Sequence, residues 1–497
     1  MKLKSVVRVF CALAIGLLPG VAHAQHSTGS YIQHVNLASG TVAVVSSGSP
    51  SAYTQPVTFT ATVPSGATGT VTFFADGTAI NTPAPVTISG TISSAITTIS
   101  TLSVGTHSIT ATYSGDSNFT SATSTAISQV VGKGASGLTL ASAPNPSNFG
   151  SNVTFTATLA STATGNVTFF DGGTSLGVVV ATSGTASFST TALTAGQHSI
   201  TAVYAGDANF NGLTSNTVLQ QVNKNGAVSP VLTGSPNPAT YGTTVVFTAT
   251  MPSNATGTVT FLDNGASIGT GTLTAGVATF SISTLTAGPT PHPITASYAG
   301  DANYAASVSN LVSETINKQT GETITLATSL TPAAFSTPVT FTATVPNGAT
   351  GTVTFYDNGV SIGTGTVTAG VATYTTSTLS VGTHPISATY GGDTNYSSVS
   401  TTTATNVSQV ISLGTATVAI SGAPNPSTYG GSVLMTIIVT GQNGVIPTGS
   451  VTLMDGTTAL GSALPLDGTG KATSSVSTLT AGDHKITATY SGDTNYK

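Results

Sequence analysis

The chain has 497 residues, of which only 5% are charged and 39% are hydrophobic. Ordinary globular domains carry about 25% charged residues. Low charge with many β-branched residues favours strands over disorder, because disordered chains are typically rich in charge. The formal net charge is −5, and the basic residues form no stripe beyond the first eight positions. This balance excludes a typical nucleic-acid-binding protein and gives little attraction to anionic membranes.

The first 24 residues have the three parts of a secretory signal peptide. Lys2, Lys4 and Arg8 make a basic start, an apolar run follows over 9–21, and Ala22-His23-Ala24 is an A-x-A cleavage site. The apolar run is too short to span a membrane. We therefore expect cleavage after Ala24, no membrane insertion, and a mature protein that is secreted or held at the cell surface.

Loss of this segment would change the chemistry available to the mature chain. The one cysteine of the chain, Cys11, lies inside it, so the mature protein would have no disulfide and no thiolate metal site. Six lysines and fourteen acidic residues would remain, with a formal charge of −8. Each folded unit must then be held by core packing alone, as immunoglobulin-type sandwiches of about 100 residues can be.

After a polar lead-in over 25–40, apolar and polar residues alternate strictly. In Val57–Val63 the four odd-numbered residues are apolar and the three between them are threonines. This period of two predicts a half-buried strand. A second strand is expected from Thr70 to Phe73, and Asp76-Gly77 marks the tight turn of a hairpin. A later strand should turn Ile109, Ala111 and Tyr113 inward.

That later strand belongs to a segment, residues 105–119, that returns nearly unchanged four more times. Each copy holds a tyrosine followed by Gly-Asp-x-Asn and an aromatic residue, and the tyrosines are Tyr113, Tyr204, Tyr298, Tyr390 and Tyr490. A fixed period of about 90–100 residues indicates an array of similar modules. Turn residues divide each module into about seven short strands, which is typical of an immunoglobulin-like β-sandwich.

The repeat predicts an all-β chain of five such modules in tandem. Their expected bounds are 41–131, 137–222, 228–317, 323–411 and 416–497. The linkers are so short that neighbouring modules should touch end to end. The fifth module carries an insertion, 441–447, and stops before the closing strand that the other four have. We expect an open sheet edge there, which a partner could fill by strand exchange.

Three recurring motifs carry a family resemblance. They are Pro-Val-Thr-Phe-Thr-Ala-Thr-Val, Thr-Gly-Thr-Val-Thr-Phe followed by an Asp-Gly turn, and Gly-Thr-His-x-Ile-x-Ala-x-Tyr-x-Gly-Asp-x-Asn-Tyr. They resemble the bacterial immunoglobulin-like repeat family of the group-3 type, over residues 41–497. The resemblance implies tandem spacer or adhesive modules in secreted or surface proteins, and it implies no particular ligand.

Ten of the fourteen acidic residues occupy just two kinds of position. Five follow the glycine after the repeated tyrosine: Asp116, Asp207, Asp301, Asp393 and Asp493. Five lie in the hairpin turn: Asp76, Asp171, Asp263, Asp357 and Asp455. Turns favour aspartate for local hydrogen bonds, and the two sets should lie at opposite ends of a module. A pair of catalytic carboxylates is therefore not expected, and we predict no enzyme activity and no catalytic residue.

One histidine per module also recurs, at inward parity: His107, His198, His292, His384 and His484. Metal sites need clustered ligands, and these histidines are about 90 residues apart. We interpret each as a corner residue bonded to a turn carbonyl.

Calcium is the one cofactor that the pattern leaves open. If modules stack in line, Asp76 would approach Asp207 and Asn209 of the next module. In the same way, Asp171 would approach Asp301 and Asn303. Calcium needs six to eight oxygen ligands, more than these side chains supply, so the sequence offers candidates for a junction ion but no complete site.

Three functions are compatible with these observations. The first is an exported, non-enzymatic stalk or spacer with weak multivalent adhesion to a surface, protein or glycan. The second is the accessory region of a larger secreted enzyme or binding protein with its active domain beyond residue 497. The third is a self-associating adhesin that uses the open edge of module 5.

Overall fold

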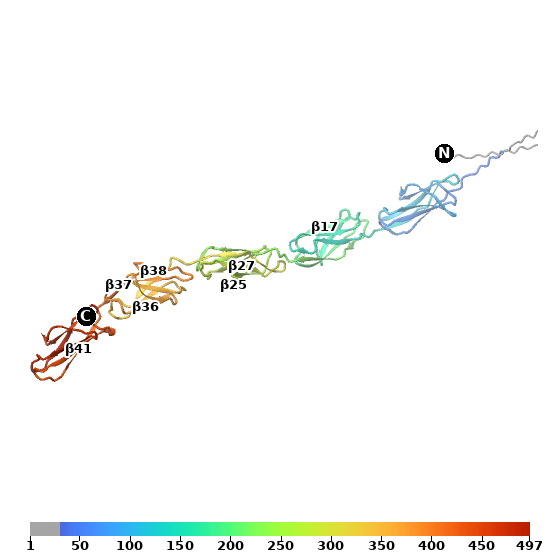
Figure 1. Ribbon diagram of the computed structural model, residues 1–497. Helices are drawn as coiled ribbons and strands as arrows, with labels where there is room; N and C mark the ends of the chain where they lie inside the picture. The colour runs from blue at the N-terminus through green and yellow to red at the C-terminus, as the bar shows by residue number, and fades with distance from the viewer. Residues whose placement is uncertain (1–29) are drawn as a thin grey trace, which may run out of the picture. The chain divides into compact units, whose positions relative to one another are not determined.

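The computed structural model of the chain describes residues 30–497, and these residues are all-β (Figure 1). The single helical segment among them is a 3-10 turn, η1 (Gln442–Gly444). The predicted signal peptide and residues 25–29 lie outside the described part. The chain divides into two compact units: one runs to Asn225 and includes Ala302–Ala305, and the other holds the remaining residues to Lys497.

Module 1 consists of two sheets with a core between them. The first has the order β1 (Ala43–Ser46), β3 (Val57–Val63), β8 (Ile92–Ile99), β7 (Thr87–Ser89). The second has the order β2 (Ser51–Ala52), β11 (Ile127–Gly132), β9 (Gly105–Tyr113), β4 (Thr70–Ala75), β5 (Thr78–Ala79), with β6 (Ala84–Pro85) and β10 (Ala122–Thr123) at its margins. Neighbouring strands are antiparallel except β2 and β11, which are parallel.

Modules 2 and 4 repeat this plan. In module 2 the first sheet contains β12 (Thr139–Ala143), β14 (Val153–Thr158) and β17 (Thr185–Thr190). The second sheet contains β13 (Ser147–Asn148), β20 (Val218–Asn223), β18 (Gly196–Tyr204), β15 (Asn166–Asp171), β16 (Thr174–Val180) and β19 (Leu213–Thr214). In module 4 the sheets are β31 (Thr325–Thr328), β33 (Val339–Thr344), β36 (Val371–Thr376), and β32 (Ala333–Ala334), β39 (Val407–Ser412), β37 (Gly382–Tyr390), β34 (Thr352–Asp357), β35 (Val360–Thr366), β38 (Val399–Ser400).

Module 3 departs from the plan at its last strand. Its sheets are β21 (Val231–Ser235), β23 (Val245–Thr250), β26 (Val277–Ile282), and β25 (Ala266–Thr272), β24 (Thr258–Asp263), β27 (His292–Tyr298), β28 (Ser307–Val308). The closing strand is split into β29 (Val312–Glu314), which pairs with β27, and β30 (Ile316–Asn317), which pairs with β22 (Ala239–Thr240).

Module 5 contains β40 (Ala416–Ala423), β41 (Val433–Gly441) and β45 (Lys471–Val476) in one sheet, and β43 (Thr458–Ala459), β42 (Ser450–Asp455), β44 (Leu464–Pro465) and β46 (Ile486–Tyr490) in the other. Within the residues that the structure describes, β46 pairs only with β42. Strand exchange at this edge stays a prediction. The predicted insertion over 441–447 contains η1.

The alternation read from the sequence places the core correctly. In β3, Phe59 and Ala61 are fully buried, and the threonines between the apolar residues face outward. In β9, Ile109, Ala111 and Tyr113 are likewise fully buried. Because side chains alternate across a strand, each sheet puts one apolar face against the other and leaves a threonine-rich face to solvent.

Candidate functional site

Two polar networks recur in the modules of this chain, one at each end of a module. The first is the aspartate loop that follows the repeated tyrosine. In module 1 the Asp116 Oδ1 atom accepts hydrogen bonds from the backbone N–H groups of Asn118 and Phe119, at 2.7 and 2.9 Å. Its Oδ2 atom accepts from the Thr68 N–H at 2.6 Å and from the Tyr113 hydroxyl at 2.8 Å. The carboxylate therefore ties the loop to the start of β4.

This loop recurs with the same aspartate–amide bonds, but the bond from the tyrosine hydroxyl to the aspartate is found in module 1. In modules 2, 4 and 5, an aspartate accepts from two amides of its own loop and from the N–H and hydroxyl of a threonine: Asp207 with Thr164, Asp393 with Thr350, and Asp493 with Thr448. In module 3, Asp301 accepts from both groups of Thr256. Burial raises the pKa of Asp393, but the amides of Thr350, Tyr396 and Asn395 outweigh it and lower that pKa to about 2. The pKa values of Asp116, Asp207 and Asp493 are lowered in the same way, so these four carboxylates are held ionised as structural anchors.

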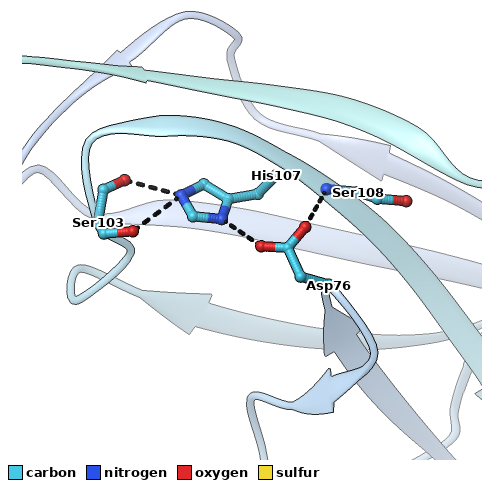
Figure 2. A network of polar contacts seen from close by, with 4 residues as sticks. All are labelled: Asp76, Ser103, His107 and Ser108. Atoms are coloured by element: carbon cyan, nitrogen blue, oxygen red, sulfur yellow. Dashed lines mark hydrogen bonds and ion pairs between the residues drawn. The ribbon is translucent and has the colours of Figure 1, made fainter.

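The second end is a histidine–aspartate pair at the hairpin turn (Figure 2). His107 Nδ1 lies 2.7 Å from Asp76 Oδ2, and His107 Nε2 lies 2.7 Å from the Ser103 carbonyl oxygen. The other oxygen of Asp76 accepts from the Ser108 N–H at 2.8 Å. The imidazole therefore bridges two turns across the end of the sheet.

All five modules contain this pair. The Nδ1–Oδ2 distances are 2.6–2.7 Å, and the pairs are His107–Asp76, His198–Asp171, His292–Asp263, His384–Asp357 and His484–Asp455. The carbonyl partners are Ser103, Thr194, Thr286, Ser380 and Thr480. The bond to a turn carbonyl, expected from the sequence, is confirmed. The aspartate partner was not anticipated, because turn aspartates were expected to bond locally.

In module 1 the pair favours the protonated imidazole of His107, since both ring nitrogens face acceptors. The Ser103 carbonyl raises the pKa of His107, burial opposes this, and the Asp76 carboxylate adds to the increase. An imidazole with both nitrogens bonded in this way has no free lone pair with which to act as a general base. The geometry fits a structural clamp.

The two aspartate sets lie at opposite ends of β4, as expected: Asp116 bonds to Thr68 before the strand, and Asp76 follows it. The residues proposed for calcium are engaged in these separate networks. Asp76 and Asp171 each bond to a histidine, and the Asp207 oxygens bond to amides. Asn303 Oδ1 accepts from the Ala195 N–H at 2.9 Å. Residues 30–497 contain no group of three or more His, Cys, Asp or Glu side chains arranged to hold a metal ion.

A pair of backbone hydrogen bonds, which we call the clasp, joins the residue just before each module to the aspartate loop of that module. The Gly134 N–H donates to the Asn209 carbonyl at 2.9 Å, and the Gly134 carbonyl accepts from the Asn211 N–H at 3.0 Å. The same bridge joins a linker residue to the loop aromatic in every module: Ala38 to Phe119, Gly134 to Phe210, Asn225 to Tyr304, Gln319 to Tyr396, and Gly414 to Tyr496. β11 ends at Gly132, so only Lys133 separates the last residue of that strand from the clasp.

An aromatic residue from one module covers the loop aromatic of another inside each unit. Tyr53 meets Phe210 edge to face, with ring centroids 5.3 Å apart, and it packs on the hydrophobic core of module 2. Three further T-shaped pairs have centroid distances of 5.4–5.5 Å: Phe149–Tyr304, Tyr241–Tyr396 and Phe335–Tyr496. We call Tyr53, Phe149, Tyr241 and Phe335 the cap aromatics. The equivalent residue of module 5, Tyr429, is 81% exposed.

The insertion of module 5 takes part in its junction with module 4. The Asn443 side-chain amide donates to the Ser336 carbonyl at 2.8 Å, and the Ser336 hydroxyl donates to the Gln442 carbonyl at 3.0 Å. End-to-end contact between neighbours, expected from the short linkers, is therefore present inside the second unit. The pattern of the sequence did not predict the cap aromatics. Each cap aromatic comes directly after a two-residue strand that pairs in parallel with the closing strand. Tyr53, for example, follows β2, whose Ser51 pairs with β11.

Sequence comparison matches the chain five times to the Bacterial Ig-like domain (group 3), at residues 44–132, 139–223, 232–317, 325–408 and 420–497. No curated protein matches the chain. Solved structures similar to it include the fibronectin(III)-like modules of Clostridium thermocellum CbhA, at 20% identity and TM-score 0.16, covering 36% of this chain and 93% of that one. The N-terminal eight Ig domains of Down Syndrome Cell Adhesion Molecule are similar at 13% identity and TM-score 0.22, covering 89% of this chain and 58% of that one.

Proposed function

The chain belongs to the bacterial Ig-like domain family (group 3), and from that premise we propose that it is an exported, non-enzymatic spacer. Domains of this family are typically extracellular. In residues 30–497 no helical segment has the length and apolar character that a membrane span requires. The signal-peptide pattern of residues 1–24 supports export to the cell surface or the medium.

The observation that carries the proposal is the single residue between each closing strand and the next clasp. Lys133 follows β11, Lys318 follows β30, and Leu413 follows β39. A linker of one residue leaves few backbone torsions free, and a cap aromatic then packs on the following loop. Such junctions suit a spacer that must hold a fixed separation rather than a flexible tether.

Small-angle scattering of residues 25–497 tests this proposal. The longest strands, such as β9 and β18, have nine residues and are about 30 Å long, so five modules in line should give a maximum dimension on the order of 150–200 Å. Six Gly/Ser residues inserted after Lys133 and after Lys318 should broaden the distribution of distances, because the clasp would be decoupled from the preceding strand. The same insertion in the exposed turn at Gly456 is the matched control. A compact wild-type particle would sink the proposal.

Weak adhesion is a second function, and the outer face of module 1 favours it. Val45 and Ile96 both pair with Thr60, so they lie in one row across the sheet, and they are 58% and 62% exposed. Ile92, on the same strand as Ile96, is 57% exposed. Exposed apolar clusters on a β-sheet face are typical of binding surfaces. Loss of binding of purified chain to whole cells after Ile92→Thr and Ile96→Thr, with retained folding, would support adhesion; unchanged binding would exclude this face.

A junction calcium ion stays a prediction. Thermal unfolding in calcium and in chelator should differ for the wild type and not for Asp171→Asn with Asn303→Ala if the ion exists. Equal midpoints in both media would remove calcium from the proposal.

A further inference from the structure

One buried position distinguishes module 3 from its neighbours. Gln129, Gln220 and Gln409 lie on the closing strand of modules 1, 2 and 4, each directly opposite the recurring histidine. In module 3 that position is Glu314, opposite His292. All four side chains are 0% exposed. The same pocket in the fold therefore holds a neutral amide three times and a carboxyl group once.

In modules 1 and 4 the glutamine fits this pocket because both ends of its amide find partners. Gln129 Nε2 donates to the Gly48 carbonyl at 3.0 Å and to the Ser51 hydroxyl at 3.1 Å, and its Oε1 accepts from the Ser46 hydroxyl at 2.6 Å. Gln409 Oε1 accepts from the Thr328 hydroxyl at 2.6 Å, and its Nε2 donates to the Leu330 carbonyl at 3.0 Å. In module 2 the Gln220 Nε2 group donates to the Pro144 carbonyl at 3.1 Å and to the Ser147 hydroxyl at 3.2 Å, and its Oε1 atom has no partner among the described residues.

Module 3 has lost those partners. The residue in register with Ser46 and Thr328 is Gly234, and the residue in register with Ser51 is Ala239. A Cβ on Gly234 would lie 2.8 Å from Glu314 Oε2, so the glutamate occupies the space that a serine or threonine side chain fills elsewhere. Neither carboxyl oxygen of Glu314 has a hydrogen-bond partner among the described residues.

An ionised carboxylate in such a place is very unfavourable, because burial removes water without supplying donors. The elements packed around Glu314 bring one group that can titrate toward it, the His292 imidazole on β27, which itself bonds to Asp263. On β21 the facing residue is Gly234, with Phe247 of β23 behind it. Burial raises the pKa of Glu314, and the positive charge of His292 only partly opposes this.

We propose that module 3 folds with Glu314 protonated, so that this module alone loses stability as the pH rises from mildly acid toward neutral. The free side chain releases its proton near pH 4.5, and the folded one at a higher pH. Folded module 3 then holds more protons than the unfolded module between those two values, and its free energy of unfolding falls as pH rises through that window. The stability that Asp393 contributes changes only below pH 3.8, and the contribution of the module 3 histidine, His292, changes only above pH 6.5. A loss of stability between these two values is therefore assigned to Glu314.

The titration can be observed directly because the chain has only two glutamates, Glu314 and Glu322. We would label the full chain with glutamate carrying carbon-13 at the carboxyl group and follow both resonances by NMR from pH 3 to pH 9. Glu322 should titrate in the ordinary range. Glu314 should stay at the protonated position well above it, and Glu314→Gln assigns the signal by removing it. A Glu314 resonance at the ionised position at pH 5 overturns the proposal.

Hydrogen exchange with peptide mapping gives the second readout. As the pH rises from below 4.5 to above the raised pKa of Glu314, local opening of residues 312–317 should rise relative to 218–223 and 407–412, by about tenfold in total for each unit by which that pKa is raised. Glu314→Gln should abolish the rise, because a glutamine carries no titratable proton and Gln220 occupies the same position in module 2, where its amide donates to the Pro144 carbonyl. The reciprocal variant, Gln409→Glu with Thr328→Gly, should transfer the rise to module 4. If Glu314→Gln leaves the pH dependence of residues 312–317 unchanged, the proposal is wrong whether or not the reciprocal variant folds.

Discussion

The two ends of each module use the same residue, aspartate, in opposite ways. At the loop end, Asp116 accepts from backbone amides and a tyrosine hydroxyl, which are donors at any physiological pH. At the turn end, Asp76 accepts from an imidazole, which donates at Nδ1 most strongly when charged. One end is therefore stable over all but strongly acid pH, and the other weakens as pH rises. The partner of a carboxylate, more than the carboxylate itself, therefore sets the pH range over which that carboxylate stabilises the fold.

The largest effect should come from the loop end. Asp207→Ala removes acceptors from the amides of Thr164, Asn209 and Phe210, and module 2 should lose about 2–4 kcal/mol of unfolding free energy. Asp207→Asn, which keeps one acceptor oxygen, should lose less. Hydrogen exchange of residues 153–158 reports the change. Equal losses for both variants would mean that the charge, rather than the acceptor geometry, holds the loop.

The next largest effect should come from acid, which weakens the loop end of a module. The pKa of Asp393 is lowered to about 2, against 3.8 for a free side chain. Its contribution is full above pH 3.8 and is lost as the pH falls through about 2. We expect the free energy of unfolding of module 4 to fall over this interval, as measured by hydrogen exchange in residues 339–344. In an Asp393→Asn variant the free energy of unfolding should fall less between pH 3.8 and about 2. An equal fall in both proteins would contradict the role given to Asp393.

A smaller effect, of opposite sign with pH, is expected from the turn end. His198→Ala removes the bonds to Asp171 and to the Thr194 carbonyl, and module 2 should lose about 1 kcal/mol below pH 6.5. Burial lowers the pKa of His198, but the Thr194 carbonyl and Asp171 outweigh it, so the pKa is raised. The difference from wild type should shrink as the pH rises through that raised pKa. A difference that grows with pH would reverse our assignment of the charged imidazole.

The smallest effects test the cap aromatics. A double-mutant cycle of Tyr53→Ala and Phe210→Leu should give a coupling of about 0.5–1.5 kcal/mol in the stability of module 2. Tyr429→Ala is the matched control, because its ring is 81% exposed, and it should change stability by less than about 0.5 kcal/mol. A coupling near zero would mean that the clasp alone makes the junction.

Strand alternation and repetition determined most of the architecture in advance. Val57–Val63, the inward Ile109, Ala111 and Tyr113, and five tandem Ig-like modules followed from the period of two and the recurring tyrosine, because both are local properties of the chain. The bond from each histidine to a turn carbonyl also followed, since those residues lie close together in sequence.

Contacts between residues far apart in the chain depend on how the strands pack, which the sequence pattern does not predict. The Asp76–His107 pair joins positions 31 residues apart, and Tyr53–Phe210 joins two modules, so no local pattern announces either contact. Glu314 is the sharpest case. In the sequence it is one acid left over from the two aspartate sets, but the register of β27, β29 and β21 places it opposite His292 and beside Gly234, where no donor faces it. Burial and the absence of a partner are properties of packing, and they change the chemistry of the same side chain.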